Sequence, residues 1–234
     1  MSQDIFVGLQ KLTLLDFPGY VACTLFTGGC NMRCPFCHNA LLVTDAQSQR
    51  AYKNEEILSF LKKRVGVLDG VAITGGEPTL MRGLREFIVE ARALGYKIKL
   101  DTNGTRPDVL IDLIESGLLD YVAMDIKNCK EKYGSTVGFD DRYDITPIMK
   151  SIDFLMQGKV DFEFRTTVSR TFHSECDIVE LAKWISGNEK FYIQQFKDSG
   201  NLIGEGIEAY PDEQLRSFLD KILPFVPNAQ LRGI

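Results

Sequence analysis

Residues 21–39 have the sequence VACTLFTGGCNMRCPFCHN, in which an apolar run is followed at once by three closely spaced cysteines. The apolar run at residues 21–26 contains β-branched and aromatic side chains and predicts a buried strand. Cys30, Cys34 and Cys37 follow it with C-x3-C-x2-C spacing. Three thiols on one short loop can face a single soft metal centre, so the strand and the loop together predict a metal site at a strand end.

Beyond this stretch, short apolar runs alternate with longer amphipathic stretches. The apolar runs predict further strands at residues 70–74, 98–102, 121–126, 160–168 and 191–195. The amphipathic stretches predict a helix capped by Asn54 and helices at residues 83–94, 107–116, 145–157, 174–186 and 211–223. Six strand-then-helix units predict a parallel sheet with right-handed crossovers. Because a closed eight-unit barrel typically needs about 250 residues, we expect an α/β fold: a partial, open (β/α)6 barrel of the TIM type.

Length and composition fit one globular domain. The 234 residues are 44% hydrophobic and 25% charged, without a linker or low-complexity segment, so we expect a single domain over residues 1–234. Residues 1–20 should add a flanking strand or hairpin, with the strand at residues 5–15. No apolar stretch approaches the roughly 20 residues of a membrane span, and no signal peptide is recognised. A net charge of −5 argues against nucleic-acid binding. We therefore expect a cytoplasmic protein that binds neither membranes nor nucleic acid.

Polar motifs follow each predicted strand. TGGEP (residues 74–78) ends the second strand, DTNG (101–104) the third, and MDIK (124–127) the fourth. Arg165 lies within the fifth strand, and the sixth strand ends with Gln194, Gln195 and Lys197. In parallel α/β folds the carboxyl ends of the strands form the ligand-binding edge, so these motifs predict one shared site.

The cysteine loop, which we define as residues 28–39, has only three cysteines. Structural zinc sites generally take four protein ligands, and no second cysteine pair exists here, although a zinc loop remains an alternative. Cys23, Cys129 and Cys176 are isolated and are expected to take no part in the site. Three cysteines on a [4Fe–4S] cluster would leave one iron without a protein ligand and therefore open to a substrate or cofactor.

At these residues the chain resembles the radical S-adenosylmethionine (SAM) superfamily, whose hallmark is C-x3-C-x2-C with an aromatic residue, here Phe36, before the last cysteine. The cysteine loop, TGGEP and DTNG occur in the family's order. GLQK at residues 8–11, DFPG at 16–19 and the Cys-His-Asn sequence at 37–39 are similar to glycyl-radical-enzyme activases. The resemblance is narrowest to activating proteins of anaerobic ribonucleoside-triphosphate reductase, which are related to the pyruvate formate-lyase activase.

The resemblance implies an oxidoreductase with two cofactors, one [4Fe–4S] cluster on Cys30, Cys34 and Cys37 and one SAM. Catalysis would proceed through the cluster. Reduced flavodoxin or ferredoxin would donate one electron, and cleavage of SAM would give methionine and a 5′-deoxyadenosyl radical. That radical would take a hydrogen atom from the Cα of a glycine on a partner enzyme. The residues expected to contact SAM are Phe36, His38, Gly75, Gly76, Glu77, Asp101, Asn103, Lys127 and Arg165.

Several of these residues have other interpretations. Asp101 and Asp125 could hold a cation or a ribose hydroxyl, or could serve as helix caps and turn residues. Lys127 could be a surface lysine. Arg165, if it points inward, needs an anion such as the SAM carboxylate, whereas outward it would need none. Lys197 stands where the pyruvate formate-lyase activase carries a histidine, which leaves the adenine contact open.

Other functions are less well supported by the sequence. It has no recognisable Ser-His-Asp constellation, no G-x-G-x-x-G dinucleotide motif and no P-loop. The nearest enzymatic alternative is a radical SAM enzyme that acts on a small molecule, such as a deazapurine carboxy synthase. The alternative from another class is a non-catalytic iron–sulfur or zinc-binding interaction module.

Overall fold

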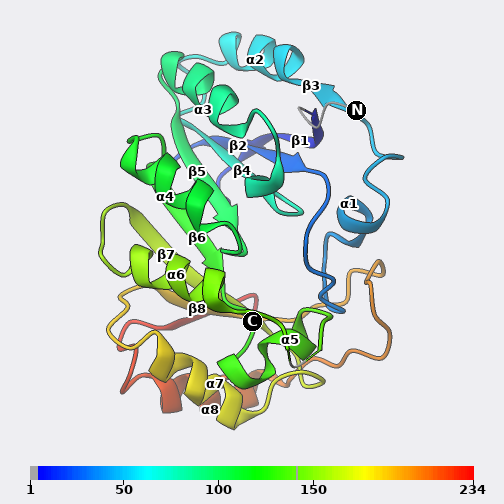
Figure 1. Cartoon of the computed structure of the whole chain (residues 1–234), viewed down its shortest axis with the longest axis vertical. Helices are drawn as coiled ribbons and strands as arrows, with labels where there is room; N and C mark the ends of the chain where they lie inside the picture. The colour runs from blue at the N-terminus through cyan, green and yellow to red at the C-terminus, as the bar shows by residue number, and fades with distance from the viewer. Residues whose placement is uncertain (1–4, 141) are drawn as a thin grey trace.

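One nine-stranded sheet organises the chain in the computed structural model, which describes residues 5–140 and 142–234. The strand order is β3-β1-β2-β4-β5-β6-β7-β8-β9 (Figure 1). Every pairing from β2 to β9 is parallel, whereas β1 is antiparallel to both of its neighbours. The strands are β1 (Ile5–Thr13), β2 (Ala22–Thr27), β3 (Tyr52–Lys53), β4 (Gly70–Gly75), β5 (Lys97–Thr102), β6 (Tyr121–Asp125), β7 (Asp161–Val168), β8 (Phe191–Gln195) and β9 (Gln230–Arg232).

Helices follow the parallel strands and cover the outer face of the curved sheet (Figure 1). The predicted α/β fold with six strand-then-helix units in an open, partial barrel is confirmed. The helices are α1 (Ala40–Thr44), α2 (Asn54–Lys62), α3 (Leu84–Ala93), α4 (Pro107–Glu115), α5 (Tyr133–Thr136), α6 (Thr146–Leu155), α7 (Glu175–Trp184) and α8 (Asp212–Ile222). Within the described residues, no helix is long and apolar enough to cross a bilayer.

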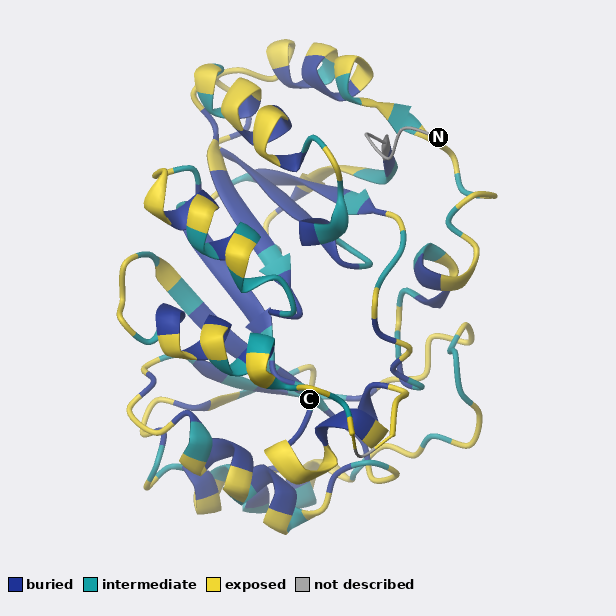
Figure 2. Ribbon diagram, in the orientation of Figure 1, coloured by how far each residue is buried: buried dark blue, intermediate teal, exposed yellow. Residues whose placement is uncertain are grey.

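The main core lies between the sheet and these helices. Figure 2 shows each long helix with buried residues toward the sheet and exposed residues toward solvent, the pattern that an amphipathic helix requires. Ile57 and Leu61 of α2 and Phe87 of α3 are almost completely buried there. Replacing a buried side chain of the size of Phe87 by alanine typically lowers the free energy of unfolding by about 3–5 kcal/mol, so these contacts dominate the placement of the helices.

The amino end of the barrel is closed by Phe17. Its ring is 1% exposed and lies with its centroid 6.3 Å from that of Tyr121, at the start of β6. Gly70, the first residue of β4, must be small because a Cβ there would come within 2.8 Å of the Phe17 ring. With this end filled, the opening of the barrel lies at the carboxyl ends of the strands, where the polar motifs are.

Two elements at the amino side differ in detail from the sequence-based expectations. The flanking strand predicted at residues 5–15 is β1, and residues 1–4 lie outside the described part of the chain. Asn54 does not cap α2, so that prediction was wrong by one residue. Lys53 occupies the cap position with extended dihedral angles because it still pairs with β1, and Asn54 is already helical.

Candidate functional site

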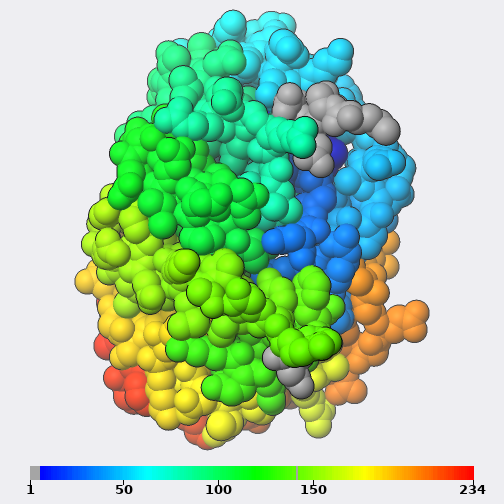
Figure 3. Space-filling model, in the orientation of Figure 1, coloured from blue at the N-terminus to red at the C-terminus, as the bar shows by residue number. Residues whose placement is uncertain are grey.

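A cavity of about 250 Å³ opens at the carboxyl ends of the strands. Its wall combines the cysteine loop with residues from β4, β5, β6, β7 and β8. In Figure 3 the blue atoms of the segment after β2 reach the surface beside green atoms from the middle of the chain. The residues that line the cavity are Cys30, Met32, Cys34, Phe36, Cys37, His38, Asn39, Val43, Thr74, Gly75, Gly76, Asp101, Thr102, Asn103, Asp125, Lys127, Arg165, Thr167 and Gln194.

Backbone hydrogen bonds from three distant segments hold the cysteine loop. Gly29 donates to the carbonyl of Leu42 over 2.7 Å, Arg33 to the carbonyl of Val137 over 2.9 Å, and Gly204 to that of Pro35 over 2.8 Å. These bonds hold the beginning and the middle of a loop that has no regular secondary structure, and all three of its thiols line the cavity.

All six cysteines are free thiols, and only the three of the loop line the cavity. Cys23 is buried in the core on β2, Cys129 lies 3.7 Å from a carboxylate oxygen of Asp177, and Cys176 is exposed. Burial raises the pKa of the Cys34 thiol to about 12, and the nearby Lys127 ammonium opposes that shift. Because the thiolate is the metal ligand, Lys127 favours the form of Cys34 that binds metal.

The three thiols are not gathered around one point. No group of three or more His, Cys, Asp or Glu side chains in residues 5–140 and 142–234 could hold a single metal ion. A single zinc ion needs its ligands to converge on one centre. Iron–sulfur clusters are bound by cysteine thiolates at separate irons, so thiols spread around one cavity suit a cluster better than a single ion.

The two glycines of TGGEP bring β4 against the cysteine loop. A Cβ on Gly76 would lie 1.8 Å from the carbonyl oxygen of Gly29, and a Cβ on Gly75 would lie 2.3 Å from backbone atoms of Thr27. Gly75 also has a φ of 124°, which side chains rarely tolerate. Both glycines therefore allow a close backbone contact that leaves their own backbone on the cavity wall.

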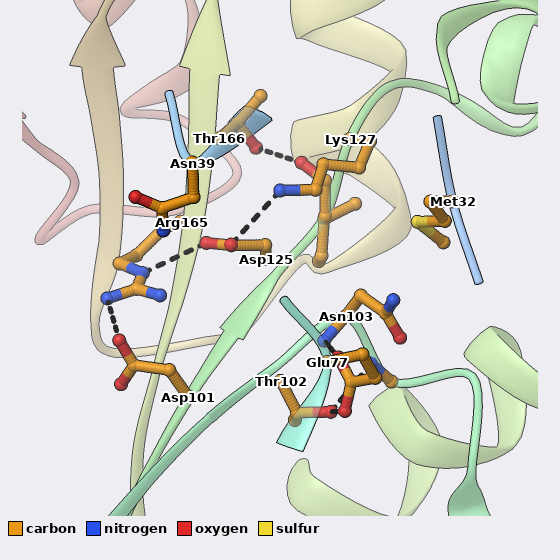
Figure 4. Close-up of polar contacts among 12 residues, drawn as sticks. Met32, Asn39, Glu77, Asp101, Thr102, Asn103, Asp125, Lys127, Arg165 and Thr166 are labelled. Carbon is orange, nitrogen blue, oxygen red and sulfur yellow. Dashed lines mark hydrogen bonds and ion pairs between the residues drawn. The ribbon is translucent and has the colours of Figure 1, made fainter. Parts of the chain in front are cut away.

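Glu77 lies behind the cavity wall, which differs from the expected contact with SAM. The residue is 1% exposed and is absent from the cavity lining. Its Oε1 accepts from Thr79 N at 3.1 Å and from the Thr102 hydroxyl at 2.7 Å, while Oε2 accepts from Asn103 N at 2.7 Å. Burial raises the pKa of Glu77, and these donors counteract it. The carboxylate thus joins the ends of β4 and β5 (Figure 4).

Arg165 points inward and lies between two carboxylates of the protein (Figure 4). Its Nε donates to Asp125 Oδ1 over 3.0 Å and its Nη1 to Asp101 Oδ2 over 3.1 Å. Lys127 Nζ donates to the other oxygen of Asp125 over 3.0 Å. The anions that an inward Arg165 needs are therefore supplied first by Asp101 and Asp125. The place between these two acids, which we considered for a bound cation, is occupied by the Arg165 guanidinium.

These ion pairs set the charge of the cavity wall. Burial alone would raise the pKa of Asp125, but Arg165 and Lys127 lower it to about 2. Burial likewise opposes ionisation of Asp101, and Arg165 and Lys99 reverse that effect, so its pKa is lowered. The pKa of Lys127 is raised because Asp125 and the Cys34 thiol outweigh its burial. Asp101, Asp125, Arg165 and Lys127 are therefore ionised at neutral pH.

The remaining predicted residues occupy different depths of the site. Phe36 is buried, with its ring centroid 5.6 Å from that of Phe172. His38 is exposed at the mouth, 5.8 Å from the ring of Phe196, and burial of part of its ring lowers its pKa. Asn103 donates to Cys30 Sγ over 3.7 Å. Lys197 is exposed and does not line the cavity.

Sequence reasoning missed several lining residues. Thr167 lies two residues after Arg165 on β7 and therefore points to the same face, a period-two relation that could have identified it. Asn39 donates from its side chain to the carbonyl of Gly75 over 3.2 Å and so links the end of the cysteine loop to β4. Met32 is buried and lines the cavity, and nothing in the sequence distinguishes it from a core methionine.

Comparisons with known proteins agree on one family. A family profile described as the radical SAM superfamily matches residues 24–185. The chain is 33% identical over 232 residues to a Methanocaldococcus jannaschii protein named "Putative glycyl-radical enzyme activating enzyme", covering 97% of this chain and 95% of that protein. A match of 34% over 92 residues is to a 7-carboxy-7-deazaguanine synthase of Hyperthermus butylicus and covers 39% of this chain and 38% of the synthase.

A solved structure shows the same fold. The crystal structure of SuiB from Streptococcus suis bound to S-adenosylmethionine superposes on this chain with a TM-score of 0.68 at 16% identity. The match covers 88% of this chain and 48% of SuiB, so the chain spans about half the length of that protein. At this identity the likeness concerns the fold alone.

Proposed function

This chain belongs to the radical SAM superfamily, and from that membership we propose that it is an activase that generates a glycyl radical on a partner enzyme. The partner that the sequence favours is an anaerobic ribonucleoside-triphosphate reductase, with reduced flavodoxin or ferredoxin as electron donor. The observation that carries the proposal is one cavity whose wall combines three cluster-type cysteines with Arg165 of β7 and Lys127, which follows β6.

The donor set fits a [4Fe–4S] cluster with one open iron. Cys30, Cys34 and Cys37 all line the cavity and the other three cysteines do not, so thiolates of this chain would hold three of the four irons. Burial raises the pKa of Cys34, and the Lys127 ammonium offsets part of that rise and so favours the thiolate. When bound, a reduced cluster of this kind supplies the electron that cleaves SAM.

The chain's own residues would bind and orient SAM. Lys127 uses one of its three ammonium donors on Asp125 and lines the cavity, so it can offer another to a carboxylate. The backbone at Gly75 and Gly76 is exposed to the cavity beside the cysteine loop and offers carbonyl oxygens to an amine. Asp101 and Asp125 fix the Arg165 guanidinium in advance, which reduces the entropy lost when an anionic group binds.

The share of each homologue that the match covers supports a macromolecular substrate. The match to the activating-enzyme homologue runs almost end to end in both proteins, whereas the match to the deazaguanine synthase covers well under half of each. A glycine is a suitable hydrogen donor because its Cα carries no side chain that would block approach. An extended loop of a partner would approach from the carboxyl ends of the strands, because the residues that line the cavity lie there.

Electron paramagnetic resonance tests this proposal directly. Anaerobically reconstituted protein is reduced with dithionite, supplied with SAM, and mixed with candidate glycyl radical enzymes. A doublet signal from a glycyl radical on the reductase, together with 5′-deoxyadenosine, supports the proposal. Formation of 5′-deoxyadenosine without a radical on any glycyl radical enzyme would favour the small-molecule alternative.

The non-catalytic alternative gives a different result in the same assay. A cluster carrier or zinc-binding module would bind metal through the cysteine loop but would neither bind nor cleave SAM. Absence of 5′-deoxyadenosine from protein with a full, reducible cluster would therefore reject the catalytic function altogether.

A further inference from the structure

Lys99 is a buried lysine that the proposed reaction does not use. Its side chain is 3% exposed and its ammonium contacts Oδ1 of Asp101, two residues later on β5. Both side chains point to the same face because alternate residues of a strand do so. Lysine is almost never fully buried unless it is paired, so this position requires an explanation.

Lys99 completes an alternating chain of five charges, which we call the charge chain: Lys99, Asp101, Arg165, Asp125 and Lys127. Asp101 receives Lys99 on Oδ1 and Arg165 on Oδ2. Asp125 receives Arg165 on Oδ1 and Lys127 on Oδ2. Each of the four carboxylate oxygens thus has its own cationic partner, and the charge chain crosses three adjacent strands, β5, β6 and β7.

Another acid of β7 is paired with a cation outside the charge chain. Glu163 lies two residues before Arg165 on β7 and accepts two hydrogen bonds, of 2.7 and 2.9 Å, from Arg232. It also accepts from the Tyr121 hydroxyl over 2.9 Å. Glu77 is bonded by neutral donors at the ends of β4 and β5. Neither acid contacts Lys99, so the Lys99 ammonium pairs with Asp101.

We propose that Lys99 is a permanent counter-ion of the Asp101 and Asp125 pair. It supplies the positive charge that a bound metal ion would otherwise supply. Two inward carboxylates that share a site repel each other and need positive charge between and beside them. Arg165 supplies it between them, and Lys99 supplies it at the buried end. The site therefore needs no added cation, and Lys99 is a positioning residue that fixes Asp101 and, through it, Arg165.

Chemical rescue of the full chain without cluster or SAM tests this proposal. Thermal unfolding is measured in equal concentrations of choline, sodium, potassium and ethylammonium chloride. The wild-type midpoint should be the same in all four salts. Lys99→Ala should unfold about 10 °C lower in choline, because an uncompensated buried charge remains. Small cations that fit the space left by the side chain should return most of that loss, whereas choline is too large.

Two variants control for loss of packing and of surface charge. Lys99→Met fills the space without a charge, so it should be destabilised and should not respond to the small cations. Lys97→Ala removes a lysine of the same strand whose side chain is 49% exposed and paired with Asp120. Asp120 keeps Arg92 and the backbone N–H of Ile98 as donors in this variant, so its midpoint should shift by about 2 °C or less.

A wild-type midpoint raised by sodium or potassium over choline would overturn the proposal, because the acids would then be binding a cation despite Lys99. Lys99→Ala without rescue would also overturn it. If both single variants fail to fold, Lys99→Met combined with Asp101→Asn decides, since it removes both charges. A folded double variant supports the counter-ion role, and an unfolded one rejects it.

A second measurement connects Lys99 with the proposed function, on which this part alone rests. In protein with a reconstituted cluster, Lys99→Ala should bind SAM about tenfold more weakly in choline, and potassium should restore the affinity. If small cations restored the unfolding midpoint of Lys99→Ala but its SAM affinity equalled that of the wild type, Lys99 would still be a counter-ion. Its proposed link to SAM binding would be rejected. The unfolding experiment stands even if the chain proves not to be an activase.

Discussion

The backbone N–H of Glu77 donates a 2.8 Å hydrogen bond to the carbonyl oxygen of Gly29 and so joins the end of β4 to the beginning of the cysteine loop. The contact is made between backbones, with no side chain between them. It requires that Gly76, which precedes Glu77, has no Cβ, since that atom would lie 1.8 Å from the same oxygen. The geometry of the thiols therefore depends on a residue that is not itself a ligand.

Gly76→Ala should displace the cysteine loop. We expect the free energy of unfolding to fall by about 3 kcal/mol and bound iron after reconstitution to fall well below the wild-type content. Gly95→Ala is the control, because Gly95 has a positive φ but a Cβ there would meet no other atom within 4 Å. It should cost about 1 kcal/mol and keep full iron. Wild-type iron content in Gly76→Ala would contradict the role of this contact.

Cys34→Ala should abolish both the cluster and the cleavage of SAM. Iron and sulfide analysis and chromatography of 5′-deoxyadenosine measure the two losses. Cys23→Ala is the matched control, since Cys23 is also a buried free thiol but lies in the core on β2. It should keep the cluster and lose only about 1 kcal/mol of stability. Retained cleavage in Cys34→Ala would remove this residue from the ligand set.

Lys127→Ala should weaken SAM binding while the cluster remains. The ammonium lines the cavity, so its loss removes a charged donor and should raise the dissociation constant about tenfold or more. Equilibrium binding and the visible absorption of the cluster report on the two effects separately. Lys197→Ala is the comparison, because Lys197 is exposed and outside the cavity lining. Equal affinities in both variants would exclude Lys127 from the site.

Acid should weaken the fold through Asp125. Its pKa in the folded protein is about 2, below the ordinary value of 3.8. As the pH falls below about 4, the unfolded chain takes up the proton first, so stabilisation is lost until the pH reaches about 2. The loss should amount to about 2 kcal/mol. Urea unfolding measured from pH 7 downward should show a flatter profile for Asp125→Asn than for the wild type.

An exposed carboxyl provides the control for this pH experiment. Asp112 pairs with Arg85 at the surface, with a side chain 56% exposed. The profile of Asp112→Asn should follow that of the wild type, because screened surface pairs contribute little. If Asp125→Asn also followed the wild type, the ion pairs around Asp125 would not be a source of acid sensitivity.

The sequence predicts the six strands of the parallel sheet well because their signal is local. Each is a short apolar run bounded by turn residues, and the observed bounds differ from the predicted ones by at most one residue. The short elements α1, α5, β3 and β9 were not predicted. Two or three residues such as Gln230–Arg232 carry no periodicity, and only pairing with β8 makes them a strand.

The site shows the same division between local and distant information. The spacing of the cysteines and their place after a strand follow directly from the sequence. The partners of Arg165 could not be predicted, because they come from two other strands and depend on the register between β5, β6 and β7. Glu77 was expected at the ligand for the same reason: nothing local shows that donors from β5 already occupy its oxygens.

The sheet order also has a consequence for how the protein assembles. From β2 to β9 the order of the strands in the sheet is the same as their order in the sequence. The exception is β3, which lies at the opposite edge. The cysteine loop has its β4 contact once β4 has joined β2, whereas the charge chain needs β5, β6 and β7. The loop contact needs two strands in place and the charge chain needs three, so we expect the loop to be shaped before the charge chain. Pulse-labelling hydrogen exchange should then show protection in β2 and β4 ahead of β7.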